Sequence, residues 1–78
     1  MSAKFESGDE VRISETAIRQ CRQYFGRRAQ WQRKDGDRVF IVVNVIDDKQ
    51  NDIYMLEVQE KGKTEIEQIA ACHMEPIP

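Results

Sequence analysis

One apolar stretch decides the fold of this chain: Val39-Phe40-Ile41-Val42-Val43-Asn44-Val45-Ile46. It is the most apolar and most β-branched part of the sequence, which predicts a central β-strand because such side chains pack well on a pleated sheet. Successive side chains of a strand point to opposite faces, so both faces of this strand carry apolar residues. Such a strand must be covered on both sides. The core covers one face, and the other needs either an amphipathic helix or a partner.

Further strands are expected on both sides of this stretch, at residues 10–13, 27–34, 53–59 and 64–69. In the first of them Val11 and Ile13 alternate with charged residues, which is the period of a half-buried strand. The Asp35-Gly36 pair predicts a tight hairpin between the second strand and the central one. Five short strands joined by tight turns favour a small barrel, because closure removes unpaired strand edges.

Polar segments separate the later strands, and the end of the chain is expected to pack against them. Residues 47–52 are all polar and predict a turn, as do residues 60–63 around a glycine. Residues 70–78 are expected to form a compact tail that Met74 and Ile77 anchor in the core.

A short helix is expected over about residues 15–25, in the first long connection. Apolar side chains fall there at helical spacing, at Ala17, Ile18, Cys21, Tyr24 and Phe25. A hydroxyl side chain just before or inside the first turn, from Ser14 or Thr16, can cap it. Gly26 suits the left-handed exit. A helix this short is marginal alone, so its apolar stripe must dock on the sheet.

Length and composition limit the chain to one small domain. It has 78 residues, of which 40% are hydrophobic and 33% charged, so residues 1–78 are expected to form a single globular domain with a thin core. The sequence has no apolar run long enough for a membrane span and no apolar N-terminal stretch typical of a secretory signal, so a cytoplasmic location is expected. Cys21 and Cys72 are then free thiols. With His73 they fall short of the four ligands of structural zinc, so no metal site is expected.

The charge is unevenly distributed. Residues 19–38 hold seven basic and two acidic side chains, whereas residues 39–78 hold three basic and eight acidic ones. Tyr24, Phe25 and Trp31 lie among the arginines of the basic segment 19–38, a combination that can stack on bases and contact phosphates. The formal net charge of −2 disfavours nucleic-acid binding, because binding domains of that class are usually strongly basic.

The sequence resembles bacterial SH3-like barrels along most of its length. The resemblance rests on Gly8-Asp9-Glu10-Val11-Arg12-Ile13, on Tyr24-Phe25-Gly26-Arg27-Arg28 and on the closing segment 69–77. Families with this plan include the variable chain of ferredoxin–thioredoxin reductase and the small electron-acceptor-side subunit of photosystem I. Both work by docking to a larger partner without catalysis, so the resemblance implies an accessory role.

A weaker similarity links the chain to the type II dihydrofolate reductases. Their signature is a V-Q-I-Y stretch that lines a pore at the centre of a tetramer. The matching positions here are Glu67-Gln68-Ile69-Ala70, of which only Gln68 and Ile69 agree. The resemblance therefore does not extend to the reductase signature as a whole.

The sequence favours a non-catalytic protein-interaction module of a larger complex or of a homo-oligomer. It has a single histidine and no nucleophile set, phosphate loop, metal spacing or cofactor motif, so no catalytic residue and no cofactor is expected. The candidate contact residues are four aromatic side chains and two neighbouring arginines: Tyr24, Phe25, Trp31, Phe40, Arg27 and Arg28. Core packing is the alternative for the aromatics. Two other functions are a nucleic-acid-binding barrel that uses residues 19–38 and an enzyme that forms only when several protomers share one pore.

Overall fold

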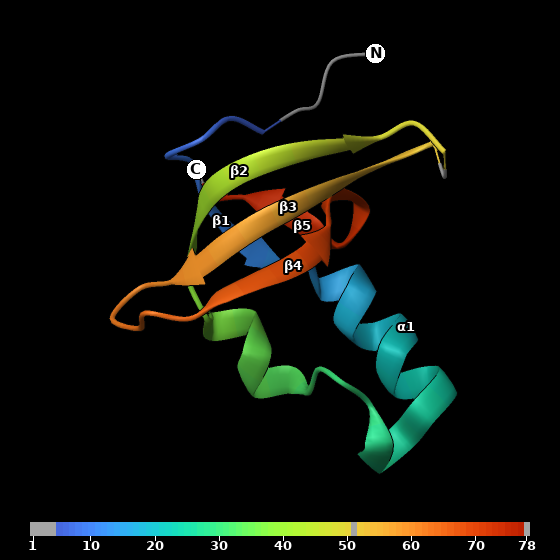
Figure 1. Ribbon diagram of the computed structural model, residues 1–78. Helices are drawn as coiled ribbons and strands as arrows, with labels where there is room; N and C mark the ends of the chain where they lie inside the picture. Colours follow the sequence, from blue (N-terminus) through green and yellow to red (C-terminus); the bar gives the residue numbers. More distant parts are fainter. Residues whose placement is uncertain (1–4, 51, 78) are drawn as a thin grey trace.

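The strands of the computed structural model, which describes residues 5–50 and 52–77, form one antiparallel sheet with a helix beside it (Figure 1). The strands are β1 (Glu10–Ile13), β2 (Phe40–Asp48), β3 (Ile53–Glu60), β4 (Ile66–Ala70) and β5 (Met74–Pro76). The helix α1 (Glu15–Phe25) follows β1, and three short 3-10 turns are η1 (Gly26–Arg28), η2 (Arg33–Asp37) and η3 (Ala71–His73). The chain is therefore mainly β with one helix, as the sequence predicts.

The order of the strands is β4-β3-β2-β1-β5. Within residues 5–50 and 52–77, β4 pairs only with β3 and β5 pairs only with β1. The sheet is therefore open along two edges, and the barrel closure expected from the sequence is not confirmed. Residues 1–4, 51 and 78 lie outside the described residues, so the expected turn over 47–52 and the expected domain over 1–78 are described only in part.

The helix has the bounds that the sequence predicts. Ser14 is the N-cap, and its side-chain oxygen accepts a hydrogen bond from the backbone N–H of Ala17 at 3.1 Å. Gly26 ends the helix with φ of +56°, a conformation that other residues rarely adopt. Ala17 and Ile18 in the first turns are buried, whereas the last turn extends past the sheet.

A β-bulge in β2 explains why this strand is apolar at so many positions. Val42 pairs with Val58, but Asn44 pairs with Glu57, so Val43 is an extra residue with no partner across the ladder. The bulge exchanges the two faces, so Val45 packs against the core beyond it. Val43 is 43% exposed. The expectation that both faces of residues 39–46 are covered along their whole length is therefore wrong at Val43.

The segment between α1 and β2 differs from the prediction of a strand over residues 27–34. It forms the turns η1 and η2, and the expected Asp35-Gly36 hairpin is absent from the described structure. Asp35 caps η2, because its carboxylate accepts a hydrogen bond from the backbone N–H of Gln32 at 2.7 Å. Gly36 lies against α1, where a β-carbon would be in van der Waals contact with the Cδ1 atom of Ile18 at 3.4 Å. The fifth strand comes instead from the expected tail, where Met74 pairs with Ile13.

The core lies between one face of the sheet, the first half of α1 and the loop that follows it. Its buried side chains are Phe5, Val11, Ile13, Ala17, Ile18, Trp31, Phe40, Val42, Leu56, Val58, Ile69 and Met74. Two of the candidate contact residues belong to this core. Phe40 has no exposed surface and Trp31 is 8% exposed, so the interpretation of both as surface anchors is replaced by core packing.

Candidate functional site

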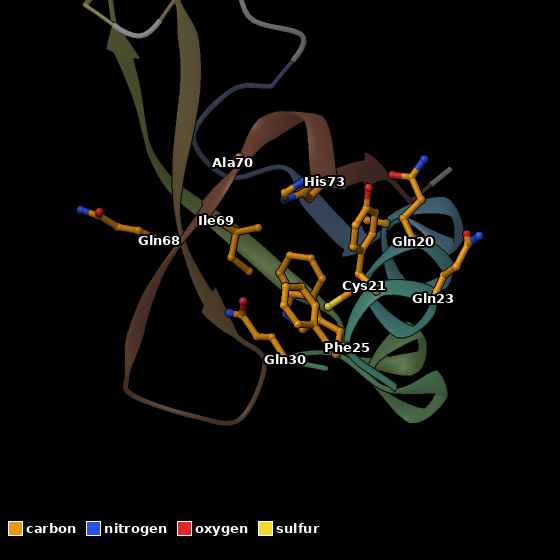
Figure 2. A pocket seen from close by; sticks show the side chains of 12 residues that line it. Gln20, Cys21, Gln23, Phe25, Gln30, Gln68, Ile69, Ala70 and His73 are labelled. Carbon is orange, nitrogen blue, oxygen red and sulfur yellow. The ribbon is translucent and has the colours of Figure 1, made fainter. Parts of the chain in front are cut away.

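An open groove of about 860 Å³ separates α1 from the edge strand β4 (Figure 2). Ala17, Cys21 and Phe25 line it from the helix, and Ile69 lines it from β4. The groove exists because the sheet does not close, so no strand fills the space beside β4. We call it the α1–β4 groove.

Two adjacent aromatic side chains stand at the helix end of the α1–β4 groove. Tyr24 is 86% exposed and Phe25 is 63% exposed, and their ring centroids lie 6.3 Å apart. Both continue the apolar stripe that begins at Ala17 and Ile18, but only the first turns of α1 reach the core. A helix of eleven residues is about 16 Å long, and the buried residues of α1, Ala17 and Ile18, lie near its start. The stripe therefore continues onto the surface.

The floor of the groove combines two aromatic rings and one aliphatic side chain. Trp31 packs edge-on against His73 with ring centroids 5.3 Å apart and an interplanar angle of 75°. Ile69 beside them is 4% exposed. These three residues come from the loop after η1, from η3 and from β4, so the groove is built by segments that are distant in the sequence.

No charged side chain lines the α1–β4 groove among the residues that the structure describes. Its polar lining consists of His73 and of glutamines from three segments, namely Gln20, Gln23, Gln30 and Gln68. Figure 2 shows the side chain of Gln68 pointing away from the groove. Its neighbour Ile69 points to the groove side instead, as expected from the alternation of side chains along a strand.

Basic side chains lie at one end of the groove, in η1. Arg27 and Arg28 are exposed, and they fall in the chain between two groove residues, Phe25 and Gln30. Within the described part of the chain neither has a carboxylate partner, and the same holds for three further cations, Arg22, Arg33 and Lys34. The end of the groove at η1 is therefore positively charged.

Arg38 differs from the other cations of the basic segment because acidic groups surround it. Its guanidinium lies 2.6 Å from Glu60, 3.0 Å from Glu67 and 3.3 Å from Asp35, and it stacks 4.8 Å from the centroid of the Phe40 ring. Partial burial lowers the pKa of Arg38, but the combined effect of Glu60, Glu67 and Asp35 raises it overall. Arg38 thus joins η2, β3 and β4 and is not available to a ligand.

The same contacts predict how stability depends on pH. The hydrogen bond from Arg38 lowers the pKa of Glu60 below its ordinary value of 4.5. The Glu60 carboxylate of the unfolded chain therefore binds a proton at higher pH than that of the folded chain. The stabilisation of the folded state by this ion pair is fully present above pH 4.5 and is lost as the pH falls through the lower folded-state pKa. Urea unfolding at several acidic pH values should show that the free energy of unfolding falls less steeply with decreasing pH for Glu60→Gln than for the parent chain. Glu65→Gln, at an exposed position, is the matched control and should leave the slope unchanged.

The structure brings together four of the six candidate contact residues. Tyr24, Phe25, Arg27 and Arg28 are exposed around one end of the α1–β4 groove, and Trp31 forms part of the floor. Phe40 lies outside the lining and belongs to the core alone.

The sequence reasoning missed most of the lining, including three residues at the β4 side of the groove. Ile69 was assigned to an ordinary strand, Ala70 to the tail that follows it, and His73 was considered only for metal binding or nucleophilic chemistry. The one sequence feature that could have indicated them is the absence of proline and lysine from residues 66–70, which leaves an edge strand unprotected.

Within residues 5–50 and 52–77, no three His, Cys, Asp or Glu side chains gather in a group that could hold a metal ion. Among the described residues, no helix is long and apolar enough to cross a membrane. No family model matches the chain, and neither a curated protein nor a solved structure shows significant similarity to it.

Proposed function

We propose that this chain is a non-catalytic interaction module that binds a protein partner, or a second copy of itself, through the α1–β4 groove. The observation that carries the proposal is the exposure of Tyr24 and Phe25, at 86% and 63%, beside an apolar groove. Exposed aromatic side chains next to an apolar depression are typical of the residues that dominate binding energy in protein interfaces. Covering them would extend the buried stripe of α1 by a further turn.

The proposal agrees with the resemblance to SH3-like docking subunits, which implies binding without catalysis. We propose a cytoplasmic location, where thiols stay reduced, because Cys21 and Cys72 are both free. The module needs no cofactor for this role, since its contact surface consists of side chains and backbone.

The proposal predicts a cross-link at the groove and not elsewhere. The photoreactive residue p-benzoylphenylalanine replaces Phe25 in one variant and Val43 in a second, since Val43 is also an exposed apolar residue but lies on β2. On illumination in cells, the first variant should give a discrete adduct, and Tyr24→Asp in the same chain should weaken it. The mass of the adduct distinguishes a second copy of the chain from another protein. Equal adducts at both positions, or none at position 25, would refute the proposal.

Nucleic-acid binding is the second candidate function. Five cations of the segment 19–38, namely Arg22, Arg27, Arg28, Arg33 and Lys34, have no carboxylate partner among the described residues. They favour this function, because phosphate binding needs cations that are not already neutralised. A salt titration of binding to single-stranded DNA or RNA tests it. Absence of retardation at low salt eliminates this function, because its affinity depends mainly on the release of counterions.

A further inference from the structure

The outer edge of β4 is an unprotected strand edge. Residues 66–70 pair with β3 on one side, and within the described chain no backbone hydrogen bond joins them to any other segment. Strand edges of this kind accept additional strands unless proline, lysine or a bulge blocks them. Residues 66–70 contain neither proline nor lysine, and their pairing with β3 has no register shift.

The opposite edge of the sheet, at β5, is protected, so the two edges differ in how readily they can accept an added strand. β5 has three residues and ends at Pro76, which has no N–H to donate. The next residue, Ile77, already donates its backbone N–H to the carbonyl of Glu10 at 3.1 Å. β5 therefore offers little backbone for an added strand.

The α1–β4 groove lies alongside the open edge. Ile69 and Ala70 of β4 line one side of it, and Cys21 and Phe25 of α1 line the other (Figure 2). A strand added at β4 would therefore enter the groove, with alternate side chains against the floor at Trp31. Because apolar side chains such as Trp31, Ile69 and Phe25 contribute most of the exposed lining, with His73 and glutamines between them, apolar side chains fit best at those positions.

Charge selects the kind of segment that fits. The groove itself carries no charged side chain, so a sugar–phosphate backbone laid along it would find cations only at one end. That end holds Arg27 and Arg28, both exposed and without carboxylate partners among the described residues. An extended peptide with an apolar middle and acidic residues at the end near η1 is complementary to this surface in both polarity and charge.

We infer that the α1–β4 groove binds an extended segment of a partner protein as a sixth strand on β4, with the acidic residues of that segment near Arg27 and Arg28. This inference rests on the proposed function and names the partner of the same site. Backbone hydrogen bonds to β4 provide affinity, and the groove and the two arginines provide selectivity.

Fluorescence anisotropy with synthetic peptides tests the inference. The probe is a fluorescein-labelled peptide that alternates valine and threonine between aspartates at both ends, and its matched control carries lysines in place of the aspartates. We expect the aspartate peptide to bind at least about tenfold more tightly than the lysine peptide. Arg27→Glu combined with Arg28→Glu should abolish this preference. Lys49→Glu, the same change of charge at an exposed position in the β2–β3 turn, should leave it intact.

Two further measurements identify strand addition. N-methylation of the peptide at every second residue removes hydrogen-bond donors from one side of it, so one of the two possible methylated peptides should lose binding and the other should retain it. Hydrogen exchange should also show increased protection of amides within residues 66–70 when the unmethylated aspartate peptide is present. If neither methylated peptide loses binding, or if the protection of β4 is unchanged, strand addition is refuted.

The remaining outcomes separate this inference from the proposed function. If the synthetic peptides do not bind but the variant at position 25 still forms a cross-link, strand addition by an acidic segment is refuted. The groove then remains a contact surface. If sedimentation then shows that the chain self-associates, the occupant is a second copy. If a thymidine oligonucleotide binds more tightly than the aspartate peptide and is lost in the double arginine variant, the surface binds nucleic acid and the inference is wrong.

Discussion

Phe40→Ala is expected to remove about 3–5 kcal/mol of stability, the usual loss when a buried phenylalanine is truncated to alanine. The Phe40 side chain has no exposed surface, and it also supports the guanidinium of Arg38 at 4.8 Å. Domains of this length are stable by only about 4–12 kcal/mol, at roughly 0.05–0.15 kcal/mol per residue. The variant should therefore lose a large part of the stability of the domain.

The emission of Trp31, the only tryptophan, reports this loss during urea unfolding. Val43→Ala is the matched control on the same strand, because Val43 lies at the bulge and is 43% exposed. Its loss should stay below about 1 kcal/mol, as for most partly exposed sites. A folded Phe40→Ala variant with a weakened partner contact would contradict the core position of this residue and restore it to the contact surface.

Trp31→Ala is expected to lower stability by a similar amount, about 3–5 kcal/mol, because the ring is 8% exposed and forms the floor of the α1–β4 groove. The ring also connects the loop after η1 to η3 through its edge contact with His73. For a domain of this size each kcal/mol corresponds to about 4–8 °C in Tm. Thermal unfolding followed by circular dichroism should therefore show a decrease of more than about 12 °C.

Two variants control this result. Trp31→Phe keeps an aromatic ring over Ile69 and should lose clearly less stability than the alanine variant. Tyr24→Ala, at the most exposed aromatic position, should leave Tm almost unchanged. If Trp31→Ala and Tyr24→Ala have equal effects, Trp31 does not anchor the loop, and the groove floor would have to be held by other contacts.

The sequence was sufficient for the elements whose pattern is local. Alternation at Val11 and Ile13 predicts β1, and the spacing from Ala17 to Phe25 predicts α1 with its N-cap at Ser14 and its end at Gly26. In these elements the side-chain period and the capping residues agree with each other, so tertiary contacts did not need to override them.

The segment between α1 and β2 could not be predicted because its structure depends on contacts outside it. Asp35 and Gly36 are the residues of a hairpin turn, but they also suit a 3-10 turn that Asp35 caps and that Gly36 brings against Ile18. The bulge at Val43 was equally hidden, since an uninterrupted apolar run gives no sign of an extra residue.

The candidate site was predictable in composition but not in geometry. Tyr24, Phe25, Trp31 and Phe40 are residues of one chemical kind, yet the first two are exposed and the other two are buried. Their difference arises from where α1 extends beyond the sheet and where β4 lacks a neighbour, and both facts depend on the whole fold. Arg27 and Arg28, which the sequence suggested as charged neighbours of the aromatic residues, are both exposed.

The position of the cations has a consequence for the speed of association. Arg22, Arg27, Arg28, Arg33 and Lys34 belong to α1, η1 and η2. Asp47 and Asp48 at the end of β2 and Asp52 in the β2–β3 turn lie at the opposite side of Figure 1. A molecule whose net charge is only −2 therefore has a large electric dipole moment. In the field of an anionic partner such a dipole turns the basic end forward before contact, which raises the association rate constant at low ionic strength and leaves the dissociation rate constant nearly unaffected.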